Sequence, residues 1–140
     1  MVNDRGAAAQ DSPGACVLIA DNDRGVGGLL AEVLATVGIT NEHVLDGVDA
    51  RARLAAVGFR VLVCDLDMPG VPGLEVLEGL AGAERPPAVV VVSGYVDSEM
   101  EERLARWPFV RAVLRKPFDL IEFATLVRSL LGAQSLESGR

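Results

Sequence analysis

The chain has 140 residues, of which 50% are apolar and 24% are charged, and its formal charge at pH 7 is −7. This length and composition indicate one folded domain around one core and exclude a disordered polyampholyte. The acidic balance, and the lack of any Lys/Arg stripe interleaved with aromatic residues, argue against binding of nucleic acid or of an anionic membrane and leave divalent cations as candidate partners.

The two ends of the chain differ in composition from its middle. Residues 1–14 and 133–140 are small, polar and aperiodic, so we predict two mobile tails around a domain of residues 15–132. No apolar stretch approaches the roughly 20 residues of a membrane span, and residues 1–14 lack the apolar segment of a signal peptide. We therefore expect a cytoplasmic protein. Cys16 and Cys64 border apolar runs and are expected to be small buried hydrophobic residues.

Five short runs predict β-strands. Three of them are continuously apolar and rich in β-branched residues, which is typical of central parallel strands buried on both faces. The other two, the second and the fifth, mix in polar residues and suit the edges of a sheet. In chain order the runs are Cys16–Ala20, Ile39–Leu45, Val61–Cys64, Ala88–Val92 and Val110–Leu114. The only histidine, His43, falls in the second run, so we expect an exposed strand histidine with no role in phosphotransfer or metal binding.

Helical periodicity fills the gaps between these strands. The clearest apolar stripe follows i, i+3, i+4, i+7, i+8 and i+11 from Val26 to Val37. The last helix is expected to begin with Asp119 and Glu122 in capping-box spacing and to stop at Gly132. The predicted helices lie within residues 26–37, 47–57, 74–81, 98–106 and 119–132. Five alternating strand–helix units with right-handed crossovers predict an α/β fold, in which helices cover both faces of a five-stranded parallel sheet.

The residues just after the predicted strands carry the candidate chemistry, because ligands of such folds bind beyond the carboxyl ends of parallel strands. Four of the strands run into Asp21, Asp65, Ser93 and Lys116. These side chains should therefore share one rim of the sheet. Lys116 is the only lysine among thirteen basic residues, so a chain that otherwise uses arginine keeps a compact ammonium group at this strand end.

Two of these residues predict a divalent-cation site. Carboxylates about 4 Å apart repel each other by roughly 4 kcal/mol at an effective dielectric constant near 20, so Asp21 and Asp65 need a cation between them. Mg²⁺ fits, because it prefers an octahedral shell of one or two carboxylates, several waters and a phosphoryl oxygen. Either aspartate alone could equally be a loop residue or a helix cap, but that explanation does not account for both of them beside Ser93 and Lys116.

Over roughly residues 15–132 the sequence resembles the receiver domain of two-component response regulators. The resemblance rests on four motifs at strand ends: Asp21-Asn22, Asp65 in DLDMPG, Ser93, and Lys116 in KPF. Each motif alone is weak, whereas all four in this order are specific. The resemblance implies a flavodoxin-like, doubly wound (βα)5 fold with strand order 2-1-3-4-5.

The resemblance also implies a function. Asp65 would accept a phosphoryl group from a histidine kinase or a phosphotransfer protein in a Mg²⁺-dependent reaction, so the chain would be a phosphoacceptor signalling domain rather than an enzyme. The implied metal ligands are Asp21, Asn22, Asp65 and the main-chain carbonyl of Asp67. Ser93 would hydrogen-bond one phosphoryl oxygen and Lys116 would pair with another. The Lys116–Pro117 peptide bond would be cis.

Two positions depart from the family's pattern. Asn22 stands where a second acid usually contacts the metal, and an amide oxygen ligates without charge, so we expect weaker Mg²⁺ binding than usual. Asp23 could substitute, but an N-cap of the following helix is favoured. Val113 stands where a Tyr or Phe usually rotates on phosphorylation, which valine cannot do. Either the signal travels through the backbone near Ser93 and Tyr95, or the domain mainly passes phosphate onward.

Positive charge concentrates beside aromatic residues on what the family uses as its output face. We define the output face as Tyr95, Arg103, Arg106, Trp107, Phe109, Arg111, Val113 and Arg115. This composition indicates either a docking surface for a downstream output protein or a solvated face with a tryptophan plug.

Three other readings lead to different classes of protein. Residues 25–30 (GVGGLL) suggest a dinucleotide-binding loop, but Leu30 occupies the third glycine position. Asp65-Leu66-Asp67 is similar to the first motif of haloacid-dehalogenase-like phosphatases, which also need an acidic pair after the lysine strand. Here only Asp119, at a cap position, follows. The remaining alternative is a receiver-like binding module that no longer uses phosphate, in which Asp65→Ala leaves partner binding intact.

Overall fold

The structure is a computed structural model of the chain. It describes residues 16–138, with side chains as far as Gly132. The predicted tail of residues 1–14 lies outside the described residues, as do residues 139–140. Five strands alternate with five helices along the described part. The strands are β2 (Val17–Ala20), β3 (Asn41–Val44), β4 (Val61–Asp65), β5 (Ala88–Ser93) and β6 (Val110–Arg115). The helices are α2 (Arg24–Thr36), α3 (Gly47–Ala56), α4 (Gly73–Leu80), α5 (Ser98–Ala105) and α6 (Leu120–Ser138).

The five strands form one parallel sheet in the order β3-β2-β4-β5-β6. Numbered along the chain, this is the order 2-1-3-4-5, so the predicted flavodoxin-like α/β fold is confirmed. The three continuously apolar runs form β2, β4 and β5, and every residue of these strands is buried. The two mixed runs, β3 and β6, are the edge strands, because their polar residues keep contact with water there.

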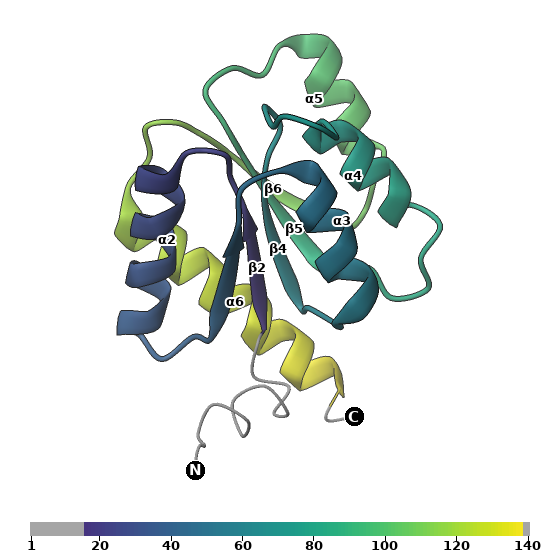
Figure 1. The fold of residues 1–140 in the computed structure, drawn as a ribbon. Coiled ribbons are helices and arrows are strands. Elements are labelled where there is room, and N and C mark those ends of the chain that lie inside the picture. Colours follow the sequence, from purple (N-terminus) through teal and green to yellow (C-terminus); the bar gives the residue numbers. More distant parts are fainter. Residues whose placement is uncertain (1–15, 139–140) are drawn as a thin grey trace.

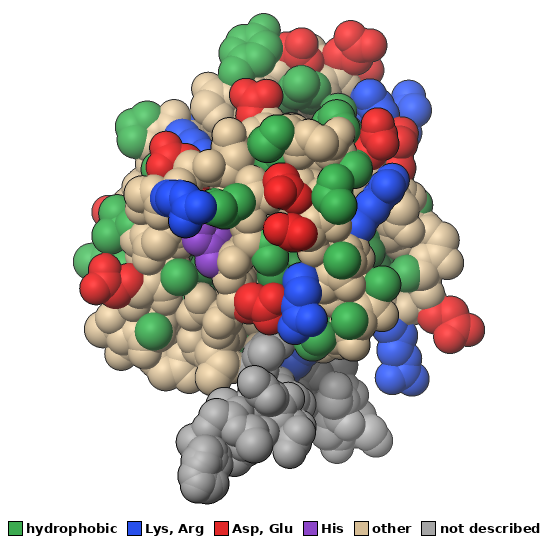
Figure 2. Space-filling view, in the orientation of Figure 1, with side chains coloured by type: hydrophobic (Ala, Val, Ile, Leu, Met, Phe, Trp, Pro, Cys, Tyr) green, Lys and Arg blue, Asp and Glu red, His purple; other side chains and the backbone are tan. Residues whose placement is uncertain are grey.

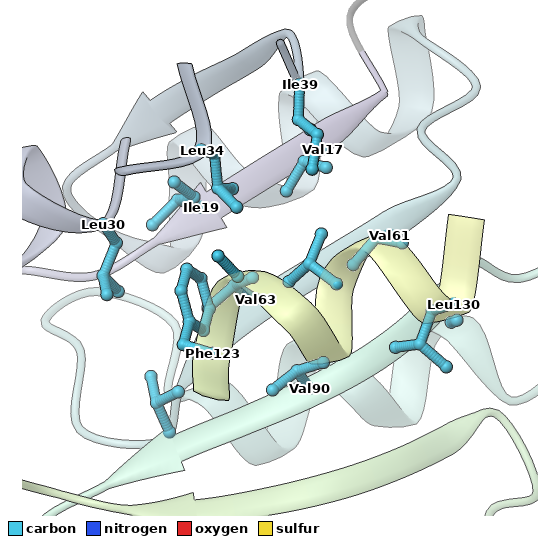
Figure 3. Packing of buried hydrophobic residues seen from close by; sticks show 14 residues of the cluster. Val17, Ile19, Leu30, Leu34, Ile39, Val61, Val63, Val90, Phe123 and Leu130 are labelled. Carbon is cyan, nitrogen blue, oxygen red and sulfur yellow. The ribbon is translucent and has the colours of Figure 1, made fainter. Parts of the chain in front are cut away.

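Helices pack on both faces of the sheet (Figure 1). α2 and α6 cover one face, where Leu30 and Phe123 pack against the side chains of β2, β4 and β5 (Figure 3). α3, α4 and α5 cover the other face, where Leu77 and Leu104 lie in a second buried cluster. Successive residues of a strand point to opposite faces, so a continuous apolar run supplies both clusters. The central strands are therefore held from both sides, and this fixes the positions of their carboxyl ends.

The last helix differs from the prediction at its end. Asp119 accepts hydrogen bonds from two main-chain N–H groups of the first turn, at 2.8 and 3.0 Å, so the predicted cap is confirmed. The predicted stop at Gly132 is wrong, because α6 continues to Ser138 and includes residues 133–138 that the sequence assigned to a tail. A glycine inside a helix costs only about 1 kcal/mol relative to alanine, so it ends a helix only where a left-handed turn follows. Gly132 has no positive φ.

The loops that follow the strands lie along one edge of the sheet, at the top of Figure 1. The Lys116–Pro117 peptide bond is cis, as the resemblance implied. α4 begins close to the end of β4: a Cβ atom on Gly73 would lie 2.4 Å from the main-chain oxygen of Asp65. Gly70, in the loop between them, has φ +79°, a conformation that glycine adopts without strain. Glycines thus bring the DLDMPG loop close against α4.

The sequence also led to predictions about the burial of the two cysteines and about membrane-spanning segments. Cys64 is buried, as predicted, and burial raises the pKa of its thiol to about 12, so it stays protonated at neutral pH. Cys16 is only half-buried, so the prediction of burial is wrong there. Within residues 16–138, none of the helices has the length and apolar content that crossing a bilayer requires.

Candidate functional site

The register of the central strands brings two aspartates together. Ala20 of β2 pairs with Cys64 of β4, so the next residues, Asp21 and Asp65, lie side by side at the carboxyl edge of the sheet. Both are buried, with exposed fractions of 0% and 3%. Buried carboxylates require a counter-charge and hydrogen-bond donors, so the surroundings of this pair are informative.

A single ammonium group lies between the two carboxylates. Nζ of Lys116 donates hydrogen bonds to Oδ2 of Asp21 at 3.0 Å and to Oδ2 of Asp65 at 3.1 Å. The other oxygen of each carboxylate accepts a main-chain N–H from two residues further on: Asp23 to Asp21 at 2.8 Å and Asp67 to Asp65 at 3.0 Å. Two carboxylates and one ammonium group leave one net negative charge on this three-residue cluster, which favours the binding of a further cation.

Burial and hydrogen bonding shift the pKa values of this cluster. Burial raises the pKa of Asp65, and the hydrogen bonds from the Asp67 main chain and Lys116 oppose this only in part. Burial by itself lowers the pKa of Lys116, but its hydrogen bonds to Asp21 and Asp65 outweigh this, so the pKa is raised. Lys116 therefore stays protonated at neutral pH, and Asp65 is a more basic, hence more nucleophilic, carboxylate than an exposed aspartate.

A polar cavity of about 730 Å³ opens at this rim. Its lining residues are Asn22, Asp23, Asp65, Asp67, Met68, Pro69, Gly94 and Lys116. Asn22 and the side chain of Asp67 are exposed at its mouth, whereas Asp65 forms part of its wall. The cavity gives a ligand of phosphate size access to the Asp65 carboxylate.

The donors around the cavity fit a hard cation such as Mg²⁺. Among residues 16–138 no group of three His, Cys, Asp or Glu side chains gathers to hold a metal ion. The oxygen-bearing residues that line the cavity include Asn22, Asp65 and Asp67, and the buried Asp21 carboxylate lies beside Asp65, a set compatible with an ion that keeps several waters. Asp23 accepts hydrogen bonds from the N–H groups of Gly25 and Val26 at 2.8 and 3.0 Å, so its predicted role as an N-cap is confirmed.

Ser93 reaches the rim, but its hydroxyl points elsewhere. The side chain is 3% exposed, and its hydroxyl donates to the carbonyl of Tyr95 at 3.0 Å and accepts from the N–H of Tyr95 at 3.3 Å. The main-chain N–H of Lys116 donates to the carbonyl of Ser93 at 2.8 Å. The structure therefore brings Asp21, Asp65 and Lys116 into direct contact, whereas the Ser93 hydroxyl is engaged by its own loop.

The output face is partly neutralised by neighbouring acids. Arg103 pairs with Glu78 of α4, and Arg115 pairs with Glu101 of α5, both at 2.9 Å. On the side of the molecule that Figure 2 shows, where α2, α3 and α4 face the viewer, acidic and basic side chains are likewise interspersed. The Trp107 and Phe109 rings stack with centroids 5.8 Å apart, and both residues are half-buried. The half-buried Val113 packs with Trp107 and Phe109 against the cluster under α3, α4 and α5, whereas Tyr95 is 70% exposed.

The sequence analysis missed one residue at the rim. His43 is half-buried rather than exposed, and its Nε2 lies 2.9 Å from the main-chain oxygen of Asp21. A Cβ atom on Gly27 would lie 2.1 Å from that nitrogen, so the imidazole occupies space that only a glycine on α2 leaves open. The signal in the sequence was a lone histidine in the strand that pairs with β2, but its contact with α2 depends on the tertiary fold.

Comparisons with known proteins agree with this geometry. The family model for the response regulator receiver domain matches residues 17–128. The response regulator MprA of Mycobacterium ulcerans (strain Agy99) is 33% identical over 121 residues, covering 86% of this chain and 52% of MprA. The chain therefore spans about half the length of that relative.

Solved structures share the fold. The signal receiver domain of the putative Luxo repressor protein from Vibrio parahaemolyticus has a TM-score of 0.82 at 20% identity, covering 89% of this chain and 95% of that one. TrrA from Thermotoga maritima, solved in complex with Mg(2+)-BeF, has a TM-score of 0.70 at 23% identity, covering 81% of this chain and 96% of that one.

Proposed function

This chain belongs to the response regulator receiver domain family, and on that basis we propose that Asp65 accepts a phosphoryl group from a phosphohistidine of a kinase or phosphotransfer protein. The observation that carries the proposal is the contact of Lys116 with both buried carboxylates at the mouth of a polar cavity. In this arrangement Asp65 has a raised pKa and access to a ligand.

The proposed step is a phosphoryl transfer between two nucleophiles. An oxygen of the Asp65 carboxylate attacks phosphorus, the P–N bond of the phosphohistidine breaks, and the imidazole leaves with the bonding electron pair and takes a proton from solvent. Lys116 then pairs with a phosphoryl oxygen, because the acyl phosphate carries more negative charge than the carboxylate it replaces. The cavity beside Asp65 gives the incoming group room to align.

A Mg²⁺ ion would be held by Asp21, Asn22, Asp65 and the main-chain carbonyl of Asp67. When bound, it would neutralise charge on the transferring phosphoryl group. The donor set supports this assignment, and TrrA, which shares the fold, was solved with Mg(2+)-BeF. Asn22 supplies an oxygen without charge, so this site binds the ion more weakly than one with a third carboxylate.

The phosphoryl group would also change the conformation of the loop after β5. We propose that the Ser93 hydroxyl leaves the Tyr95 carbonyl and donates to a phosphoryl oxygen, which draws this loop toward the cavity. Charge-assisted hydrogen bonds contribute about 1.5–3 kcal/mol each, so Ser93 and Lys116 together supply roughly 3–6 kcal/mol. Reversing a 1:99 conformational equilibrium needs about 5.5 kcal/mol, so these two contacts nearly suffice without an aromatic residue at Val113.

The proposed output is a phosphorylation-dependent contact with a downstream protein in the cytoplasm, through the output face. The domain itself would neither turn over a substrate nor bind nucleic acid. A second candidate, a binding module that no longer uses phosphate, is favoured by Asn22 and Val113. A haloacid-dehalogenase-like phosphatase would instead turn over an aryl phosphate many times.

The test is incubation with Mg²⁺ and acetyl phosphate, followed by the mass of the intact protein. We expect wild type to gain one phosphoryl group, as should the control Asp49→Asn, which changes a residue in the first turn of α3 that does not line the cavity. Asp65→Asn should gain none. An adduct on Asp65→Asn equal to that on wild type would remove Asp65 from its role, and no adduct on wild type would favour the phosphate-independent module.

A further inference from the structure

We propose that His43 is a positioning residue for the metal-binding edge of the site, a role that rests on the proposed function of Asp21. His43 lies on the edge strand β3, beside β2, and its Nε2 is 2.9 Å from the main-chain oxygen of Asp21. The main-chain N–H of Asp21 donates to the carbonyl of Val44, the next residue of β3, at 3.1 Å. Two consecutive residues of β3 thus hold both main-chain polar groups of Asp21.

The imidazole supplies a bond that the sheet itself does not. β2 ends at Ala20, so the carbonyl of Asp21 lies beyond the strand, in a residue that is fully buried. A buried carbonyl needs a donor, and His43 provides it. Because a carbonyl only accepts hydrogen bonds, Nε2 must carry the proton.

The hydrogen bond from His43 to the Asp21 carbonyl also constrains the next residue, Asn22. The peptide group that contains this oxygen also contains the N–H of Asn22 and is planar, so holding one end orients the other. The position of the Asn22 Cα atom, from which its side chain departs, is therefore constrained from β3. Asp21 and Asn22 are two of the proposed Mg²⁺ ligands, and ligand geometry matters because this ion demands near-ideal octahedral coordination.

Helix α2 is shaped to receive the imidazole. A Cβ atom on Gly27 would lie 2.1 Å from Nε2 and 2.2 Å from Cε1 of His43, closer than any real contact. The next residue, Gly28, is exposed, and a Cβ atom there would meet nothing within 4 Å. Glycine lowers helix stability, so the buried Gly27 is explained by the ring it accommodates, whereas Gly28 offers a matched control on the same turn.

The first measurement is the protonation of the His43 ring. A long-range ¹H–¹⁵N spectrum of the wild-type chain at neutral pH, in the absence of metal, should show the tautomer that carries its proton on Nε2. A ring protonated only on Nδ1 cannot donate to Asp21 and would overturn the proposal. This readout is independent of metal binding and phosphorylation.

The second measurement is the Kd for Mg²⁺ by calorimetric titration, together with the Mg²⁺ concentration that half-saturates phosphorylation by acetyl phosphate. We expect His43→Leu and Gly27→Ala to raise both values about tenfold, equivalent to 1.4 kcal/mol. Gly28→Ala should match wild type. His43→Gln, which keeps an N–H donor, should recover part of the loss. Gly27→Ala retains the ring and carries the test if His43→Leu does not fold.

The outcomes separate positioning from a merely structural role. A structural role would lower the melting temperature of His43→Leu and Gly27→Ala while leaving the Mg²⁺ affinity of the folded protein unchanged, and that result would overturn the proposal. If wild type itself neither binds Mg²⁺ nor accepts phosphate, the proposed function fails and this inference fails with it. If wild type binds Mg²⁺ and accepts phosphate, and the variants do so with unchanged Mg²⁺ affinity, only this inference is refuted and the proposed function stands.

Discussion

Replacing Lys116 by methionine removes the one positive charge that touches both buried aspartates. Asp21 and Asp65 would then lie side by side without a counter-ion, each losing a hydrogen bond of about 3 Å. Removing one partner of a buried ion pair costs about 3–5 kcal/mol. The Lys116 side chain is 23% exposed, so some solvent screens the cluster and we expect about 3 kcal/mol, the lower end, at pH 7.

The loss of stability caused by Lys116→Met should depend on pH. In wild type the pKa of Asp65 is raised by burial, so ionised Asp65 lowers stability above the ordinary aspartate pKa, and this penalty disappears as the pH falls. Lys116 holds the pKa of Asp65 down, so Lys116→Met raises it further and enlarges the penalty. The difference in the free energy of unfolding between wild type and Lys116→Met should therefore be greatest near pH 7. It should shrink on acidification, as Asp65 takes up a proton. The raised pKa of Lys116 contributes stability below the ordinary lysine pKa, so this contribution is fully present at pH 7.

The assay is urea unfolding of both proteins at pH 7 and at pH 4.5, with and without saturating Mg²⁺. The ion replaces the missing charge, so it should restore more stability to Lys116→Met than to wild type. Arg103→Met is the matched control, because its pair with Glu78 is exposed on both sides and should contribute at most about 1 kcal/mol. A loss below about 1 kcal/mol for Lys116→Met at pH 7, unaffected by Mg²⁺, would refute this reasoning.

Three other substitutions test separate parts of the account. Asn22→Asp adds a charged ligand and should tighten Mg²⁺ binding about tenfold, worth 1.4 kcal/mol; unchanged affinity in a calorimetric titration would count against Asn22 as a ligand. Asp23→Ala removes the cap of α2 and should lower stability by about 1 kcal/mol while leaving Mg²⁺ affinity unchanged, and a loss of affinity would instead make Asp23 a ligand. Phe123→Ala opens a cavity under α2 and α6 and should lower stability by about 3–5 kcal/mol in chemical denaturation. A loss below 1 kcal/mol would show that this side chain does not fill the core as described.

The sequence predicted the sheet well, for a physical reason. Strands buried on both faces are apolar along their length, and β2, β4 and β5 are apolar up to their last residues, Asp65 in β4 and Ser93 in β5. Parallel topology then places Asp21, Asp65 and Lys116 at one edge, without knowledge of any individual contact.

The features that the sequence did not predict depend on tertiary contacts. The bond from His43 to Asp21 needs the register of β3 and the space left by Gly27, neither of which has a local signal. The direction of the Ser93 hydroxyl depends on the conformation of its loop. Gly132 carries a stop signal in sequence but lies inside a helix, because a glycine ends a helix only when its backbone turns left-handed.

The central claim is that one carboxylate of the rim, Asp65, carries the phosphoryl group. The most direct measurement is to phosphorylate the chain with acetyl phosphate and Mg²⁺, reduce the acyl phosphate with borohydride, and locate the reduced residue by peptide sequencing in a mass spectrometer. We predict reduction at Asp65 alone. Reduction at Asp21, Asp67 or a distant carboxylate, with Asp65 unmodified, would contradict the account.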